Sequence, residues 1–180
     1  MKKLYHASHD GLIERFEPRP PPSPDAGVTE NAVWAIDEEH LVNYLLPRDC
    51  PRVTYYPLPE SKADDVERLI GPSGSKHVVA IESDWLERAM RESLWLYEFD
   101  LGAFIEVDAG AGYHISRQAQ IPVSKKKIED PLLELTSRGA ELRVLPSLWP
   151  LRDAVLEASL QFSFIRMRNA KSRPVSGDHS

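Results

Sequence analysis

Short apolar runs separated by proline-rich connections constrain the fold of this chain more than any other feature. The sequence has 15 prolines against 9 glycines, and the prolines cluster in segments 18–24, 47–51 and 57–59. Proline fixes φ and restricts the residue before it, so each cluster predicts a rigid, extended connection. The strand-like runs are numerous, short and irregularly interrupted by helical patterns, which favours a mixed α+β architecture over a regular βαβ repeat.

Periodicity and capping residues place the individual elements. The runs 94–100 and 103–108, joined by turn residues around Gly102, predict a hairpin. Further strands are expected over residues 3–7, 32–36, 52–56, 77–83, 113–116, 141–146 and 161–168, and helices over 37–46, 61–70, 85–93, 131–139 and 148–159. We expect one domain over residues 1–170 and a mobile polar tail over 171–180.

Composition narrows the classes of partner. The net charge of −6 gives no general affinity for nucleic acid or anionic membrane, so a nucleic-acid partner would need a local basic patch. The one cysteine, Cys50, excludes an intramolecular disulfide and a cysteine-based zinc cluster, and it fits a reducing compartment. No run is long and apolar enough to span a membrane or to act as a signal peptide, so we expect a cytoplasmic protein.

The common catalytic motifs do not occur in this sequence. It has no Walker loop and no GxGxxG, and GPSGSK at 71–76 lacks the spacing of a phosphate loop. HExxH and GxSxG are missing too. His6 and His9 fall across a strand-to-loop boundary, where their spacing sets no common direction, so no metal site is expected.

Single polar side chains are the remaining candidates, and each has two interpretations. His6 in LYHAS is either a core or rim histidine with a backbone partner, or the first residue of a site. Arg48 and Arg52 flank Asp49 in LPRDCPRV. They either pair with that carboxylate or hold a phosphate or carboxylate ligand through their guanidinium forks.

Arg166 poses the same alternative inside a predicted strand. Alternation in FSFIRMRN places it on the face of Phe162 and Phe164. An unpaired buried guanidinium is costly, so Arg166 needs either an anionic ligand or an internal ion pair. The candidate carboxylates for that pair are Glu98, Glu106 and Asp108.

Two strand-like runs carry aromatic side chains whose direction decides their role. Tyr113 and His114 are adjacent in GYHIS, so they face opposite ways and one of them at most lines a given cleft. Trp95, Tyr97 and Phe99 share one face of LWLYEF. That face is an interface if it is exposed and core if it is buried.

Two families share motifs with this chain. LPRDCPRV, GYHIS and IRMRNA together resemble a bacterial domain family of unknown function, over residues 3–170, which implies no activity. LYHAS, a proline-rich loop and AVWAIDEEHLVNYL resemble the opening of the ADP-ribosyltransferase-like fold, over residues 3–46. The second resemblance implies a mixed, mostly antiparallel split sheet, flanked by short helices, with an NAD cleft.

The transferase-like resemblance also implies roles for residues. His6 would hydrogen-bond the ribose, Tyr113 would stack on the nicotinamide, and Arg166 would complete the catalytic set. Residues implied in binding NAD are Ser8, Trp34, Tyr44, Arg48, Arg52 and His114.

The late strand departs from the usual pattern of that fold. Typical members carry a catalytic glutamate there, whereas QFSFIRMRN offers arginines, as in the RNA 2′-phosphotransferase branch. The chain is therefore either an NAD-dependent transferase of the ADP-ribosyl or 2′-phosphotransferase type, or a non-catalytic module that binds a small nucleotide or a protein segment. The sequence identifies no protein partner.

Overall fold

The computed structural model describes residues 2–21 and 27–173. The chain divides into two compact units, called unit 1 (residues 1–45 and 91–134) and unit 2 (residues 46–90 and 135–180). The expectation of one domain over residues 1–170 stays a prediction. Most of the predicted mobile tail, from residue 174 onward, lies outside the described residues.

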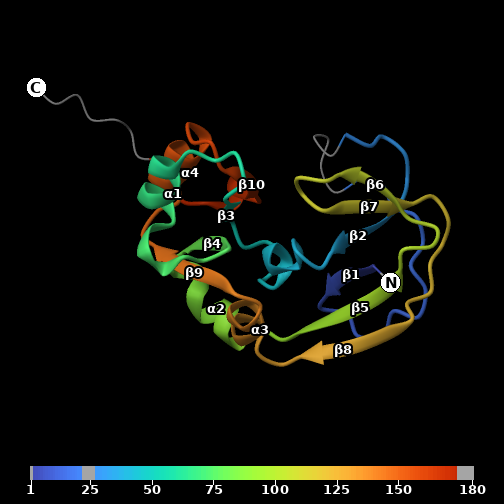
Figure 1. Ribbon diagram of the computed structural model, residues 1–180. Helices are drawn as coiled ribbons and strands as arrows, with labels where there is room; N and C mark the ends of the chain where they lie inside the picture. The colour runs from blue at the N-terminus through green and yellow to red at the C-terminus, as the bar shows by residue number, and fades with distance from the viewer. Residues whose placement is uncertain (1, 22–26, 174–180) are drawn as a thin grey trace, which may run out of the picture. The chain divides into compact units, whose positions relative to one another are not determined.

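Unit 1 is built on a six-stranded antiparallel sheet with the order β6-β7-β2-β1-β5-β8 (Figure 1). Its strands are β1 (Lys3–Ser8), β2 (Val33–Asp37), β5 (Leu94–Asp100), β6 (Ile105–Asp108), β7 (Tyr113–Ser116) and β8 (Ser124–Ile128). The predicted hairpin between β5 and β6 is wrong. Both edges of β5 are occupied, by β1 and β8, and β6 pairs with β7 instead.

One face of this sheet is covered by Phe16 from the long loop after β1. Its ring lies 5.1 Å from Tyr97 and 5.2 Å from Phe99 in edge-on contacts. Tyr97 and Phe99 are fully buried, so the core interpretation of LWLYEF is confirmed. The core cluster on this face comprises Leu4, Phe16, Val33, Ala35, Tyr97, Phe99 and Phe104.

Unit 2 contains a four-stranded sheet with the order β10-β3-β4-β9, in which the β4–β9 pair alone is parallel. Its strands are β3 (Arg52–Tyr56), β4 (His77–Glu82), β9 (Ala140–Leu145) and β10 (Gln161–Ile165). The α-helices among the described residues are α1 (Ala63–Leu69), α2 (Leu86–Arg91), α3 (Pro131–Ser137) and α4 (Trp149–Leu156). The protein is therefore α+β, with mostly antiparallel sheets and short helices.

The apolar core of unit 2 lies between its sheet and the two helices α1 and α4. Val53 and Tyr55 of β3 pack there with Leu69 from α1 and Val155 from α4. No helix among the described residues is long and apolar enough to cross a membrane.

The helix predicted over 37–46 is a turn followed by a short 3₁₀ helix, Leu41–Tyr44. Asp37 is still part of β2, and its Oδ1 accepts the backbone N–H of His40 at 3.0 Å. This contact closes a turn directly after the strand, so the helical segment begins only at Leu41 and ends before Pro47.

Candidate functional site

The β1–β2 ladder in unit 1 is short. Leu4 and Tyr5 pair with β2, whereas β1 pairs with β5 along its whole length. Just beyond that ladder, Nδ1 of His6 lies 2.9 Å from the backbone oxygen of Trp34. A carbonyl can only accept a hydrogen bond, so Nδ1 carries the proton in this contact and β2 fixes the orientation of the ring.

The side chains of His6 and Trp34 lie on opposite faces of the sheet. Tyr5 is opposite Ile36, and cross-strand partners share a face. Trp34 is two residues from Ile36 and lies on the same face, while His6 follows Tyr5 and lies on the other. Tyr113 is the β7 partner of Ile36, so His6 and Tyr113, two of the predicted catalytic residues, also lie on opposite faces.

Three predicted residues meet on one face and are called here the aromatic cluster: Trp34, Tyr44 and Tyr113. The Trp34 and Tyr113 rings are perpendicular, with centroids 5.5 Å apart. Tyr44 lies 6.2 Å from Tyr113, ring to ring, and the two hydroxyls are hydrogen-bonded. Nε1 of Trp34 is buried and has no hydrogen-bond partner among the described residues. The cluster therefore combines half-buried rings with a buried, unsatisfied donor.

Next to the aromatic cluster in sequence is a buried polar group around Gly112. Asp37 and His40 are both buried, and Oδ1 of Asp37 lies 2.7 Å from Nδ1 of His40. Burial by itself raises the pKa of Asp37, but the hydrogen bonds from His40 outweigh it, and the pKa lies below its ordinary value. No local sequence pattern indicates this group, because Gly112 lies far along the chain from Asp37 and His40.

Two further predicted residues have structural contacts. Oγ of Ser8 accepts the backbone N–H of Asp10 at 3.1 Å, which forms a turn at the end of β1. His114 is buried, with Nδ1 at 3.1 Å from the oxygen of Gly112 and Nε2 at 3.7 Å from the Glu106 carboxylate. The contacts of Ser8 and of His114 are typical of side chains that stabilise a fold.

The predicted arginines lie in unit 2. Arg52 is buried on β3, and its Nη1 donates to the carbonyl of Pro47 at 3.3 Å. Arg48 is exposed in the turn before it. Arg166 follows β10 and adopts the left-handed conformation, with φ 55° and ψ 28°. The predicted strand therefore ends at residue 165, and the expectation that Arg166 continues its alternation is wrong because the backbone turns there.

Of the two alternatives for Arg166, the internal ion pair is not seen within the part of the chain that the structure describes. Glu98 pairs with Lys3, Glu106 lies 3.6 Å from Lys2, and Asp108 accepts the backbone N–H of Ala111. Among the described residues, no group of three or more His, Cys, Asp or Glu side chains is arranged to hold a metal ion.

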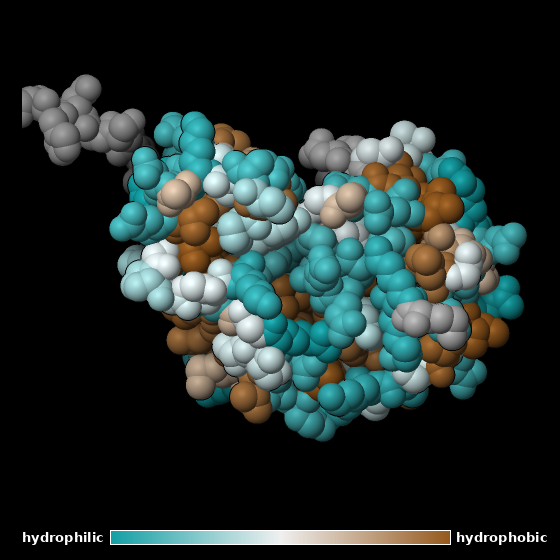
Figure 2. Space-filling view, in the orientation of Figure 1, coloured by the Kyte–Doolittle hydropathy of each residue, from teal (hydrophilic) through white to brown (hydrophobic). Residues whose placement is uncertain are grey.

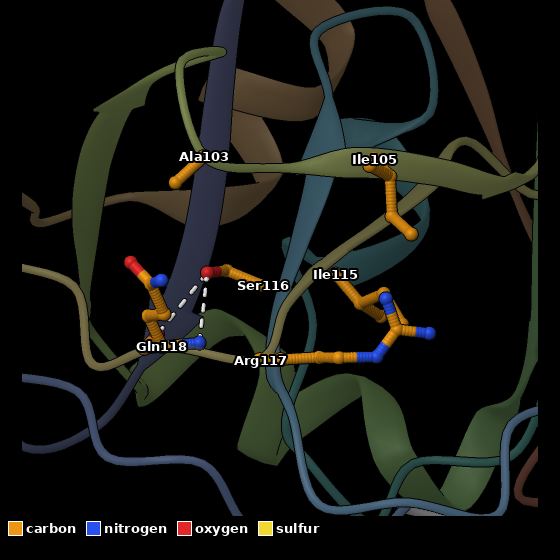
Figure 3. Close-up of a pocket in the computed structure, with 6 residues that line it drawn as sticks. All are labelled: Ala103, Ile105, Ile115, Ser116, Arg117 and Gln118. Atoms are coloured by element: carbon orange, nitrogen blue, oxygen red, sulfur yellow. Dashed lines mark hydrogen bonds between the residues drawn. The ribbon is translucent and has the colours of Figure 1, made fainter.

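A shallow pocket of about 320 Å³ lies beside the edge strand β6. Two of the lining residues, Ser116 and Gln118, are joined by hydrogen bonds of 3.1 and 3.2 Å (Figure 3). Figure 2 shows hydrophobic surface over β6, where Ile105 and Val107 are exposed. The residues that line the pocket are Ala103, Ile105, Ile115, Ser116, Arg117 and Gln118. None of them is among the predicted site residues, although Ile115 and Ser116 belong to the GYHIS motif.

Fold and geometry together define an α+β protein with an aromatic cluster on one sheet and an arginine-bearing turn on the other. The chain belongs to a family of unknown function (DUF6886), whose model matches residues 5–170. The resemblance to a domain family of unknown function is thereby confirmed. Searches of curated proteins and of solved structures found no match.

Proposed function

We propose that the protein is ADP-ribosyltransferase-like and that unit 1 binds NAD or a related nucleotide at the aromatic cluster. The observation that carries this proposal is the buried indole N–H of Trp34, which has no partner among the described residues. An unsatisfied buried donor costs about 1–3 kcal/mol. A ligand acceptor, such as the carboxamide oxygen of nicotinamide, would remove that cost.

The rings around this donor suit a planar base. Tyr44 and Tyr113 are half-buried, so each keeps part of its surface accessible. Stacking of a base on an aromatic side chain contributes roughly 1–3 kcal/mol. The hydrogen bond between the two hydroxyls holds the rings in place before a ligand arrives, which lowers the entropy lost on binding.

His6 would act on the site through β2. Its side chain lies on the opposite face of the sheet from the aromatic cluster, and its Nδ1–H donates to the backbone oxygen of Trp34. This contact would hold the backbone of Trp34 in the position that the bound nucleotide requires.

Binding without catalysis is the second candidate. It is favoured by the composition of the aromatic cluster, whose three side chains include no carboxylate to stabilise an oxocarbenium-like ribose. In that case the protein would be a nucleotide-binding module.

Thermal unfolding with increasing NAD tests the proposal. At about 100 times the dissociation constant, the ligand should stabilise the native protein by roughly 2.7 kcal/mol. Trp34→Phe keeps a ring and removes the N–H, so we expect NAD to bind about tenfold more weakly. Trp85→Phe is the matched control, because Trp85 contacts Arg88 and lies outside the cluster.

Two results would contradict nucleotide binding in unit 1: no stabilisation of the native protein at millimolar NAD, or equal affinity in Trp34→Phe. Release of nicotinamide during incubation with NAD would distinguish a transferase from a binding module, and His6→Ala should lower that release, because it removes the contact that holds the backbone of Trp34.

A further inference from the structure

We propose that unit 2 has a phosphate-binding site of its own, formed by Arg48, Arg166 and Arg168. These three residues are called here the arginine turn. The site would take a phosphate or pyrophosphate group, and it uses no residue of the aromatic cluster. It therefore does not depend on the function proposed for unit 1.

Two segments distant in sequence are held together at this place. Arg52 of β3 is the cross-strand partner of Ile165, the last residue of β10. Beyond the sheet, Nδ2 of Asn169 donates to the backbone oxygen of Asp49 at 2.8 Å. Arg48 precedes Asp49 and Arg168 precedes Asn169, so the three arginines are attached to two turns that are fixed to each other.

The arginine turn lacks carboxylate partners among the described residues, in contrast to the ion-paired arginines elsewhere in the chain. The chain has 28 acidic residues against 22 basic ones, so carboxylates are plentiful. The acidic residue within the two turns, Asp49, is exposed and forms no ion pair with the three arginines. Arginines that do form ion pairs with carboxylates are Arg15, Arg68, Arg117, Arg143, Arg152 and Arg173.

A fourth arginine adds positive charge next to these turns. Arg52, the first residue of β3, is 3% exposed, and its Nη1 donates to the carbonyl of Pro47, the residue before Arg48. Arginine is also the side chain best suited to phosphate, because its planar fork donates two parallel hydrogen bonds.

The backbone conformation of Arg166 also favours a binding site at the arginine turn. Among the described residues it is the one non-glycine residue with positive φ. Conformations of this kind are uncommon for side chains with a Cβ and concentrate at binding sites. The left-handed turn follows the last residue of β10 and leads to Asn169, whose side chain binds the backbone of Asp49, the residue after Arg48.

Calorimetric titration with inorganic pyrophosphate tests this inference. The native protein should bind pyrophosphate. Raising the salt concentration from 50 to 200 mM should weaken the affinity several-fold, because salt screens the attraction between the arginines and the anion. Arg166→Gly removes the guanidinium and keeps the left-handed backbone without strain, and Arg48→Gln removes the charge from an exposed turn. We expect each variant to lose about tenfold in affinity. Arg19→Gln is the matched control, since Arg19 is exposed and has no ion pair among the described residues.

Pyrophosphate binding that Arg166→Gly and Arg48→Gln both weaken, and Arg19→Gln does not, supports the site. No binding by the native protein, or equal affinity in all variants, overturns it. Trp34→Phe should leave pyrophosphate affinity unchanged, so failure of this site and failure of the nucleotide site in unit 1 give different results.

Discussion

Gly112 shows how much a single residue can matter in this protein. It has φ +70°, and a Cβ built on it would lie 2.4 Å from Nδ1 of His40 and 2.7 Å from Oδ1 of Asp37. Its backbone oxygen also accepts the N–H of Asp37 at 3.0 Å. Glycine is therefore required here twice, for its conformation and for the space that it leaves to the buried pair.

Gly112→Ala is expected to lower the free energy of unfolding by about 2–4 kcal/mol, because the pair must separate or the strand must shift. Gly27→Ala is the matched control in the same unit. Gly27 has φ +68° but nothing within 4 Å of an added Cβ, so strain alone should cost about 1 kcal/mol. Denaturant unfolding of both variants measures the difference, and equal losses would show that the contact with His40 and Asp37 contributes nothing.

At Arg166 the reverse substitution is informative, because glycine would replace a side chain in the left-handed conformation. A non-glycine residue in the left-handed region is strained by about 1–2 kcal/mol, and substitution by glycine relieves this strain. Glycine also makes the unfolded chain more flexible, which lowers the free energy of unfolding and offsets part of the gain. Arg166→Gly should therefore leave stability unchanged or raise it by up to about 1 kcal/mol in thermal unfolding. A loss of more than 1 kcal/mol would mean that the Arg166 side chain itself stabilises the fold.

At the scale of elements, single polar side chains connect helices to the rest of unit 2. Arg143 of β9 donates to the carbonyls of Leu69 and Ile70 and to the hydroxyl of Tyr55, so it satisfies the carboxyl end of α1. Burial by itself lowers the pKa of Arg143, but the hydrogen bond that its Nε donates to the Glu141 carboxylate, together with the other nearby groups, outweighs this effect and raises the pKa. The guanidinium therefore stays charged and caps the helix at all ordinary pH values.

Arg143→Met should destabilise the protein by about 2–4 kcal/mol, since it leaves several acceptors half-buried without a donor. Arg143→Lys should recover less than half of this loss, because an ammonium cannot reproduce the fork. Chemical denaturation gives both values, and full recovery by lysine would indicate that charge alone matters.

Asp65 connects α1 to the turn before β10. One carboxylate oxygen accepts from Arg68 at 2.9 Å, and the other accepts from the backbone N–H and the hydroxyl of Ser159 at 2.9 and 2.8 Å. These donors, Arg68 foremost, lower the pKa of Asp65 to about 2. Its contribution to stability is complete above the unfolded pKa of about 3.9 and disappears as the pH falls toward 2.

Asp65→Asn should therefore lower the denaturation midpoint at pH 7, and the difference from the native protein should shrink between pH 4 and pH 2. Asp64→Asn is the control, because Asp64 is exposed in the same first turn of α1 and shares its helix-end electrostatics. A difference between Asp65→Asn and the native protein that persists unchanged at pH 2 would contradict the lowered pKa.

For the molecule as a whole, the burial of each strand predicts how strongly its backbone amides are protected from hydrogen exchange. Every residue of β4 is buried, and this strand has neighbours on both sides. Every residue of β6 is exposed, and β6 is an edge strand. Hydrogen exchange followed by mass spectrometry should show slow exchange in β4 and fast exchange in β6. Equal protection of the two strands would indicate that β6 is covered in solution.

The sequence by itself determined the class of fold, most of the elements and the family. Alternating and continuous apolar patterns depend on neighbouring residues, so β3, β4, α1 and the buried face of Tyr97 and Phe99 could be predicted. Tertiary structure decided what depends on distant residues. β1, not β6, pairs with β5, Arg166 leaves its strand, and His6 and Tyr113 lie on opposite faces. Strand partners and their register follow from long-range packing, which no local pattern encodes.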